Sequence, residues 1–416
     1  MTTSRPGLSW TVLAVLNMRE TLLSVLMVNL DTMNIISKAR RPGSVNEVYK
    51  MMSMPKKHRQ LSFPVARLPR DLLSQMLVVC GKIGSESIDL CRAKAKEIGV
   101  ILIECRDSSW QLTLKSIRKH FDTGRHKGVL LLGGSKEIPS TNIMYQGTPG
   151  YTDWFLQDVD GDGSPDVPVG RVFGDSATLT YHMDPFIIDS NIAVVFDSQP
   201  GRSNRHVDAL VKLGFDVEVL PRYEPDHSKL LGVSEFILQF SDGLYSSRIH
   251  GTPDMWATHN SLILSHEQAA SIKFEGYPVV YSEACSTARE GALVKAFLSR
   301  GAAYIGSTLD TMNNTRPFDD WRDCAYADGY KFGFMDLLDS NGLIGQVKLG
   351  VDRAIFEHLG TAETAEIEAI RTGRGTELKS EKALSAIEWV MYGNPLRRTT
   401  VGPNADFKPG RIIVDT

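Results

Sequence analysis

Short apolar runs alternate with amphipathic segments along most of this chain. In its first half, residues 76–80 and 129–132 are continuously apolar, while residues 85–98 between them carry charged residues at helical spacing. Apolar runs that do not alternate with polar residues are typical of strands covered on both faces of a parallel sheet. The pattern therefore predicts an α/β fold with mostly parallel sheets.

The same pattern restarts in the second half. The predicted strands are residues 76–80, 100–103, 129–132, 192–196, 216–220, 244–249, 278–282 and 303–307. The predicted helices are residues 85–98, 108–121, 205–213, 234–242, 266–273, 292–300, 334–359 and 377–392. The restart indicates two α/β units side by side.

Four segments follow from these patterns. Residues 1–60 form a predicted N-terminal helical segment, read either as a layer packed on the main fold or as a regulatory segment with a cleavable basic linker. Residues 61–185 form a first subdomain, residues 186–400 a second, and residues 401–416 a C-terminal tail.

Composition narrows the class of protein. The 416 residues are 42% hydrophobic and 23% charged, which is ordinary globular usage. The 46 lysines and arginines and the 49 aspartates and glutamates give a net charge of 46 − 49 = −3. The chain therefore has no overall positive charge that would favour binding to nucleic acid. No segment has the apolar length of a membrane span. Five cysteines without a Cys-x-x-Cys pair favour neither a disulfide framework nor a zinc ribbon, and we expect a cytoplasmic protein.

Several familiar motifs are missing. The chain has no phosphate-binding Gly-x-x-x-x-Gly-Lys-Ser/Thr loop, no Gly-x-Ser-x-Gly elbow and no His-Glu-x-x-His helix. Gly161-Asp-Gly163 lacks the third glycine of a dinucleotide fingerprint and is too acidic to hold a pyrophosphate.

A histidine and a cysteine each follow a predicted strand. His250-Gly251 comes after residues 244–249, and Cys285 comes after residues 278–282. Sites in open α/β sheets form at the carboxyl ends of strands, so the two side chains are expected on one rim. A thiolate is a nucleophile that an imidazole can generate, and the N–H groups of Gly251 and Cys285 are oxyanion-hole candidates. The alternative is a buried structural cysteine and a histidine satisfied in the core.

Ordered blocks around this pair resemble the gingipain-like cysteine peptidases of the caspase-fold clan. The blocks cover about residues 75–400: Val129-Leu-Leu-Leu-Gly-Gly-Ser135, Glu137-Ile-Pro139, Thr152-Asp-Trp-Phe155, Asp158-Val-Asp-Gly-Asp-Gly-Ser-Pro-Asp166, Val167-Pro-Val-Gly-Arg171, His250-Gly251, Ala284-Cys285, Phe297-Leu-Ser-Arg-Gly-Ala-Ala-Tyr-Ile-Gly-Ser307 and Tyr392-Gly-Asn-Pro-Leu396. The resemblance implies two caspase-like α/β/α subdomains. It also implies a cysteine endopeptidase with catalytic Cys285 and His250, acting through a thioester acyl-enzyme without a cofactor.

The resemblance also suggests a specificity. Asp153 matches the position where arginine-cleaving members place an acid, and a semi-buried carboxylate selects a guanidinium through paired hydrogen bonds. Met312 lies near the predicted pocket wall. Protein or peptide substrates with a basic residue before the cut, arginine over lysine, are expected. Alternatively, Asp153 caps a turn or belongs to the acidic loop that follows.

The acidic loop offers a candidate metal site. Asp158, Asp160, Asp162 and Asp166 alternate around glycines, and hard oxygen ligands at this spacing suit a structural Ca²⁺. A plain acidic hairpin is the alternative.

Three functions stay open. The first is a cytoplasmic peptidase, activated by processing or a protein partner, with no role for nucleic acid or membrane. The second is a catalytically inactive caspase-fold module that binds a partner. The third is a deacylase or transamidase that uses the same cysteine and histidine with another acceptor.

Overall fold

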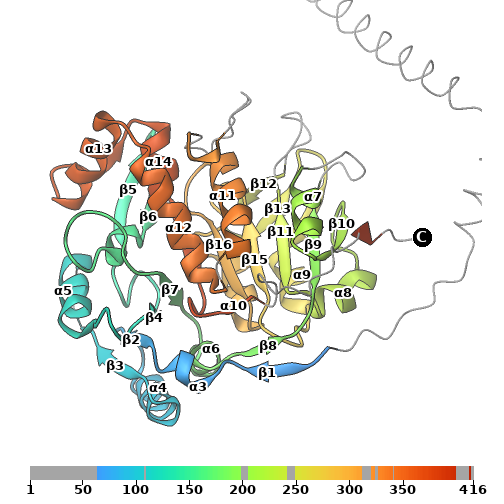
Figure 1. Ribbon diagram of the computed structural model, residues 1–416, viewed down its shortest axis with the longest axis horizontal. Helices are drawn as coiled ribbons and strands as arrows, with labels where there is room; N and C mark the ends of the chain where they lie inside the picture. Colours follow the sequence, from blue (N-terminus) through green and yellow to red (C-terminus); the bar gives the residue numbers. More distant parts are fainter. Residues whose placement is uncertain are drawn as a thin grey trace, which may run out of the picture. The chain divides into compact units, whose positions relative to one another are not determined.

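Figure 1 shows the computed structural model of the chain. The structure describes residues 63–106, 109–197, 205–240, 249–311, 320–323, 327–340, 342–399 and 412–413. Leu61–Asp415 forms one compact unit. The predicted segment 1–60, all of the tail 401–416 except residues 412–413, and most of the predicted strand 244–249 lie outside the described residues.

One sheet runs through both predicted subdomains. Its 11 strands have the order β19-β10-β9-β11-β15-β16-β18-β7-β4-β2-β3. Neighbouring strands are parallel except at β16 and β18, which pair antiparallel. The bounds are β2 (Met76–Cys80), β3 (Ile101–Glu104), β4 (Gly128–Leu132), β7 (Val169–Val172), β9 (Ile192–Phe196), β10 (Asp216–Leu220), β11 (Phe236–Gln239), β15 (Val279–Ser282), β16 (Ala303–Ser307), β18 (Trp389–Tyr392) and β19 (Ile412–Ile413).

Helices cover both faces of this sheet. On the half built by the second part of the chain, one buried cluster includes residues of α7, α11, α12, α13 and α14, and the cluster on the other face includes residues of α8, α9 and α10. In Figure 1, α11 and α12 lie in front of β15 and β16. The bounds are α7 (Arg205–Lys212), α8 (Ser228–Gly232), α9 (His266–Ser271), α10 (Ala292–Ser299), α11 (Ala327–Ser340), α12 (Ile344–Glu357), α13 (Thr361–Arg371) and α14 (Glu381–Ile387).

The other half of the sheet is covered in the same way. Two further buried clusters lie there, one with residues of α3, α4 and α6 and one with residues of α5 and η1. The bounds are α3 (Arg70–Leu73), α4 (Ser85–Ile98), α5 (Trp110–His120), α6 (Ser176–Met183), η1 (Trp154–Gln157), η2 (Pro225–His227) and η4 (Trp321–Asp323). Every residue of strands β2 and β4 is buried, as expected in a sheet that helices cover on both faces.

Three small sheets surround the large one. Strands β1 (Val65–Arg67) and β8 (Phe186–Ile188) pair antiparallel. The other two sheets are β12-β13-β14 and β17-β5-β6. Their bounds are β5 (Thr141–Tyr145), β6 (Thr148–Thr152), β12 (His250–Thr252), β13 (Met255–Ala257), β14 (Leu262–Ser265) and β17 (Glu377–Leu378).

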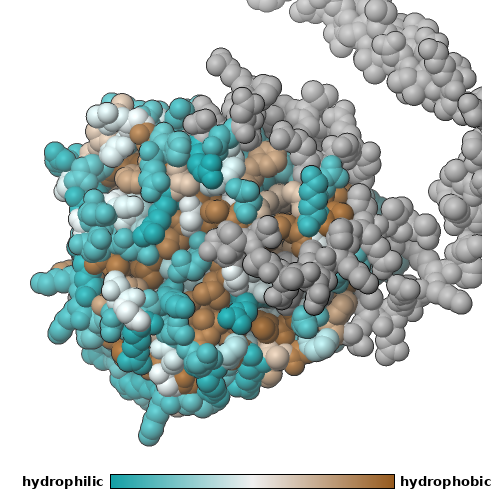
Figure 2. Space-filling model, viewed as in Figure 1, coloured by the Kyte–Doolittle hydropathy of each residue, from teal (hydrophilic) through white to brown (hydrophobic). Residues whose placement is uncertain are grey.

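The surface is mixed in character. On the face in Figure 2, apolar residues lie mainly in the middle and hydrophilic residues along the left and lower margins. Among the helices that the structure describes, none combines the length and hydropathy that crossing a bilayer requires.

The α/β fold with a large, mostly parallel sheet is confirmed, and four strands have the predicted bounds: β2, β9, β10 and β16. Three predicted helices are wrong. Residues 334–359 contain parts of two helices, α11 and α12, rather than one helix. Residues 234–242 contain strand β11, which is fully buried between β9 and β15. Residues 377–392 contain β17, α14 and β18 in turn. A short apolar run fits a buried strand as well as a buried helix turn, and here sheet pairing decides. The finer division into two caspase-like subdomains stays a prediction.

Candidate functional site

A tight turn carries Cys285. Strand β15 ends at Ser282, and the turn that follows is held by the chain after β16: the N–H of Ser286 donates to the carbonyl of Leu309 at 2.7 Å. Ser286 has φ 57°, a left-handed conformation that costs a residue with a side chain about 1–2 kcal/mol. Such conformations persist where surrounding bonds hold them, and they gather at functional sites. The backbone next to Cys285 is therefore fixed and strained.

The neighbouring strand supports the same turn. Gln239, the last residue of β11, accepts with Oε1 from the N–H of Ala284 at 2.8 Å and from the hydroxyl of Ser282 at 2.9 Å. All three residues are almost fully buried. The carboxyl ends of β11 and β15 are thus bonded together immediately before Cys285.

His250 lies on a strand that packs against this turn. In β12, His250 pairs with Ala257 and Gly251 with Trp256. A Cβ atom at Gly251 would lie 2.5 Å from the carbonyl oxygen of Cys285 and 2.2 Å from Cγ2 of Thr287. No side chain fits there, so glycine allows the backbone next to His250 to touch the cysteine turn. The structure thus places Gly251, the residue after His250, against the carbonyl of Cys285.

The environment of the thiol favours its protonated form. Sγ of Cys285 lies 3.5 Å from Oγ1 of Thr311, and that hydroxyl donates to the carbonyl of Glu283 at 2.8 Å. Burial raises the pKa of Cys285, and the contact with Thr311 opposes the shift. A base near the thiol is needed at neutral pH, and His250, whose ring centroid is 4.7 Å from that of His259, lies on the adjoining strand.

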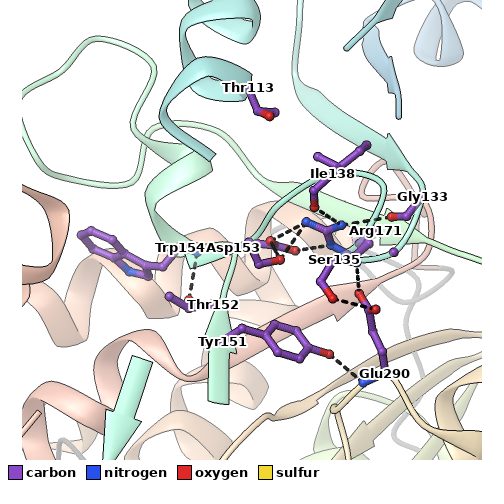
Figure 3. A network of polar contacts seen from close by, with 12 residues as sticks. Thr113, Gly133, Ser135, Ile138, Tyr151, Thr152, Asp153, Trp154, Arg171 and Glu290 are labelled. Atoms are coloured by element: carbon purple, nitrogen blue, oxygen red, sulfur yellow. Dashed lines mark hydrogen bonds and ion pairs between the residues drawn. The ribbon is translucent and has the colours of Figure 1, made fainter. Parts of the chain in front are cut away.

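Asp153 is placed differently from the sequence prediction. It is 5% exposed, and its carboxylate accepts from Nε and Nη2 of Arg171 at 2.8 and 2.7 Å and from Oγ of Ser140 at 2.7 Å. Figure 3 shows this ion pair. The guanidinium that the carboxylate binds is therefore internal, and the assignment of Asp153 to a substrate pocket is corrected. Met312 lies outside the described residues.

Arg171 belongs to a network that sequence reasoning missed. Its Nη1 donates to the carbonyls of Gly133 and Ile138 at 3.0 and 2.8 Å. Glu290, on the segment after the cysteine turn, accepts from the N–H and the hydroxyl of Ser135 at 2.6 and 2.9 Å (Figure 3). The network joins the end of β4 to the segment after Cys285. A charged residue inside the buried strand β7 was the available signal, since buried charges need partners.

The four carboxylates of the acidic loop lie close enough together to be candidate ligands of one cation. Ligand atoms of Asp158, Asp160, Asp162 and Asp166 all lie within 4.8 Å of one another. Gly161 and Gly163 adopt positive φ angles of 95° and 92° and allow the loop to turn. The carboxylates also accept backbone N–H groups: Gly161 donates to Asp158, and Ser164 donates to Asp162. Oxygen donors in this arrangement fit Ca²⁺.

We expect Ca²⁺ to stabilise the protein through this loop. Saturating Ca²⁺ should raise the melting temperature by about 1–2 °C for each kcal/mol of stabilisation. Asp160→Asn should weaken the shift because it removes one ligand charge, whereas Asp226→Asn, at an exposed acid outside the loop, should leave it unchanged. Equal shifts in the two variants, measured by thermal melting with and without EGTA, would argue against the site.

Comparisons with known proteins give little further guidance. No protein-family model matches the chain, and no curated protein matches it. Matching solved structures include an NAD-complexed D-isomer specific 2-hydroxyacid dehydrogenase from Lactobacillus delbrueckii ssp. bulgaricus, with 10% identity, a TM-score of 0.21 and coverage of 72% of this chain and 99% of the other. They also include D-lactate dehydrogenase with NAD+ from Lactobacillus jensenii, with 13% identity, a TM-score of 0.19 and coverage of 72% and 98%. A D-2-hydroxyisocaproate dehydrogenase has 12% identity, a TM-score of 0.18 and coverage of 54% and 76%.

These matches contradict the predicted function. All three neighbours are dehydrogenases, so the predicted arginine-directed cysteine endopeptidase, its thiol-protease and zymogen labels and its inactive-module alternative are corrected. Two of the neighbours hold NAD, and the expectation that no cofactor is needed is not confirmed. TM-scores of 0.21 or below do not assign the neighbours' reaction or their NAD to this chain. The gingipain-like resemblance, the cytoplasmic location and the protein partners stay predictions.

Proposed function

We propose that this chain is an enzyme of non-proteolytic acyl transfer, with Cys285 as nucleophile and His250 as the group that moves protons. The observation that carries the proposal is the contact at Gly251, where only a hydrogen atom fits between the histidine strand and the cysteine turn. The acyl donor is an ester or a thioester, and cleavage of peptide bonds is not part of the proposal.

The reaction needs two steps. His250 takes the thiol proton of Cys285, the sulfur forms a bond to the acyl carbon, and the bond to the leaving alcohol or thiol breaks as the imidazolium returns the proton to it. An acceptor, water or another nucleophile, then gives its proton to His250 and attacks the acyl carbon, and the sulfur leaves as thiolate. The N–H groups of Gly251 and Cys285 are the proposed donors to the oxyanion.

Burst kinetics test this scheme. With p-nitrophenyl acetate, we expect a burst of one nitrophenol per chain followed by slower turnover. His250→Ala should slow the burst by about 10²–10⁴-fold, the range for loss of general acid–base catalysis. His266→Ala, which removes a partly exposed imidazole paired with Glu267, should leave the burst unchanged. Equal bursts in the wild type and His250→Ala would refute the role of His250.

The raised pKa of Cys285 determines how the acylation rate depends on pH. Since burial raises the pKa of Cys285, a reaction that used the free thiolate alone would rise steadily with pH above the usual range of a cysteine. With an imidazole as the base, acylation should level off at a lower pH than it would if it required ionisation of the free thiol. The wild-type burst rate against pH therefore distinguishes the two routes within the same experiment.

A further inference from the structure

A buried carboxyl group lies one residue beyond α14. Glu388 is 0% exposed and directly precedes β18, the strand that pairs with β16. Its Oε2 accepts from the hydroxyl of Ser307, at the end of β16. Its Oε1 is buried and has no hydrogen-bond partner among the described residues. Nothing in the proposed acyl transfer uses this group.

No ion pair joins this carboxyl group to a cation among the described residues, and the negative charge of Asp310 acts on it. Burial raises the pKa of Glu388 to about 8, and Asp310 adds to the shift. The group is therefore mostly neutral at physiological pH, and it ionises on the alkaline side. The negative charge of Glu388 also contributes to the raised pKa values of Tyr145 and Tyr281.

Ser307 connects this carboxyl group to the cysteine turn. Its hydroxyl accepts from the N–H of Leu309 at 3.0 Å and is within 2.9 Å of the carbonyl of Leu309, to which it donates. That carbonyl is the one that accepts from Ser286, the strained residue after Cys285. Three hydrogen bonds therefore lead from Glu388 to the residue next to the nucleophile.

The single proton of Ser307 cannot serve two acceptors at once. When Glu388 is neutral, its own O–H can donate to Ser307, and the Ser307 proton stays on the carbonyl of Leu309. When Glu388 is ionised, it accepts the Ser307 proton in a charge-assisted bond, and Leu309 loses that donor. The negative charge also acts on Cys285, whose pKa it raises together with Asp310.

We infer that Glu388 is a positioning residue for Cys285. Its neutral carboxyl group holds the cysteine turn through Ser307 and Leu309, and its ionised carboxylate destabilises the thiolate by charge repulsion. The inference rests on the proposed function for its biological meaning, because it concerns the same nucleophile. It adds a group, remote from the substrate, that reduces the reactivity of the thiol at alkaline pH.

Alkylation of Cys285 by iodoacetamide, followed by peptide mass spectrometry at this one cysteine, tests the inference. Glu388→Gln keeps the shape and the hydrogen-bonding capacity but never ionises. At about pH 6 we expect equal rates in the wild type and the variant, because Glu388 is protonated there. At about pH 9 the variant should react roughly two- to tenfold faster, because the thiol no longer faces the negative charge of Glu388 and its pKa is lower. Lowering that pKa by one unit raises the thiolate fraction about tenfold.

A second buried glutamate provides the matched control. Glu218→Gln, on β10, should follow the wild-type profile at every pH. Superimposable profiles for Glu388→Gln and the wild type would overturn the inference, and so would a variant that reacts at a constant ratio to the wild type across the range. Alkylation requires no acyl substrate, so a burst experiment that fails while the alkylation profiles separate would refute the acyl transfer and leave the role of Glu388 standing.

Discussion

Replacing Cys285 with alanine is expected to lower the turnover of p-nitrophenyl acetate by at least about 10³-fold, to the level of residual binding and oxyanion stabilisation. The sulfur forms the covalent bond in the proposed scheme, and alanine offers no nucleophile in its place. The variant should fold, because Cys285 is only partly buried and alanine removes one atom from the turn. Equal melting temperatures would confirm that the loss is chemical.

A different cysteine serves as the control for this loss. Cys105 is buried, and its Sγ lies 3.4 Å from Oγ1 of Thr113, far along the chain from the cysteine turn. Cys105→Ala should keep the turnover per folded molecule while it lowers the stability somewhat. If Cys285→Ala turned over substrate as fast as Cys105→Ala, the nucleophile would be another group.

Replacing Arg171 with methionine is expected to destabilise the fold by about 3–5 kcal/mol, the cost of leaving one member of a buried ion pair behind. The side chain of Arg171 is 0% exposed and that of Asp153 is 7% exposed, so water cannot solvate the orphaned carboxylate. The carbonyls of Gly133 and Ile138 lose their donor as well. Urea unfolding followed by circular dichroism measures the difference.

Two further variants sharpen the stability test. Arg371→Met removes a partly exposed ion pair with Glu368 on α13 and should cost less than about 1 kcal/mol. The double variant Arg171→Met/Asp153→Leu should recover part of the loss, because it leaves no buried charge unpaired. A loss in Arg171→Met no larger than in Arg371→Met would show that the pair contributes little.

The sequence predicts the elements whose pattern is local. Strand β9 is a continuous apolar run with polar residues on either side, and its bounds follow from those residues. Strand β11 is not predictable in this way, since Phe236–Gln239 reads equally as a helix turn until β9 and β15 pair on its two sides. Pairing partners far apart in the sequence decide its structure.

In the candidate site, too, local sequence patterns predict some residues, while contacts between distant segments do not follow from the sequence. Glycine after His250 and a cysteine after a buried strand were visible in the sequence, and the close contact at Gly251 explains why a glycine stands there. The partner of Asp153 was not visible, because one carboxylate can bind an internal arginine or a substrate with the same chemistry. Arg171 lies on β7, and only the packed fold brings it to Asp153. The buried position of Glu388 likewise depends on α14, β16 and β18 together.

The most direct measurement of the central claim is the location of the acyl group in the trapped intermediate. The protein is mixed with p-nitrophenyl acetate, quenched in acid within the burst, digested and analysed by mass spectrometry. We expect one acetyl group on the peptide that contains Cys285, in the wild type and to a smaller extent in His250→Ala. An acetyl group on any other residue during the burst, or nitrophenol release with no acetyl group on Cys285, would contradict the account.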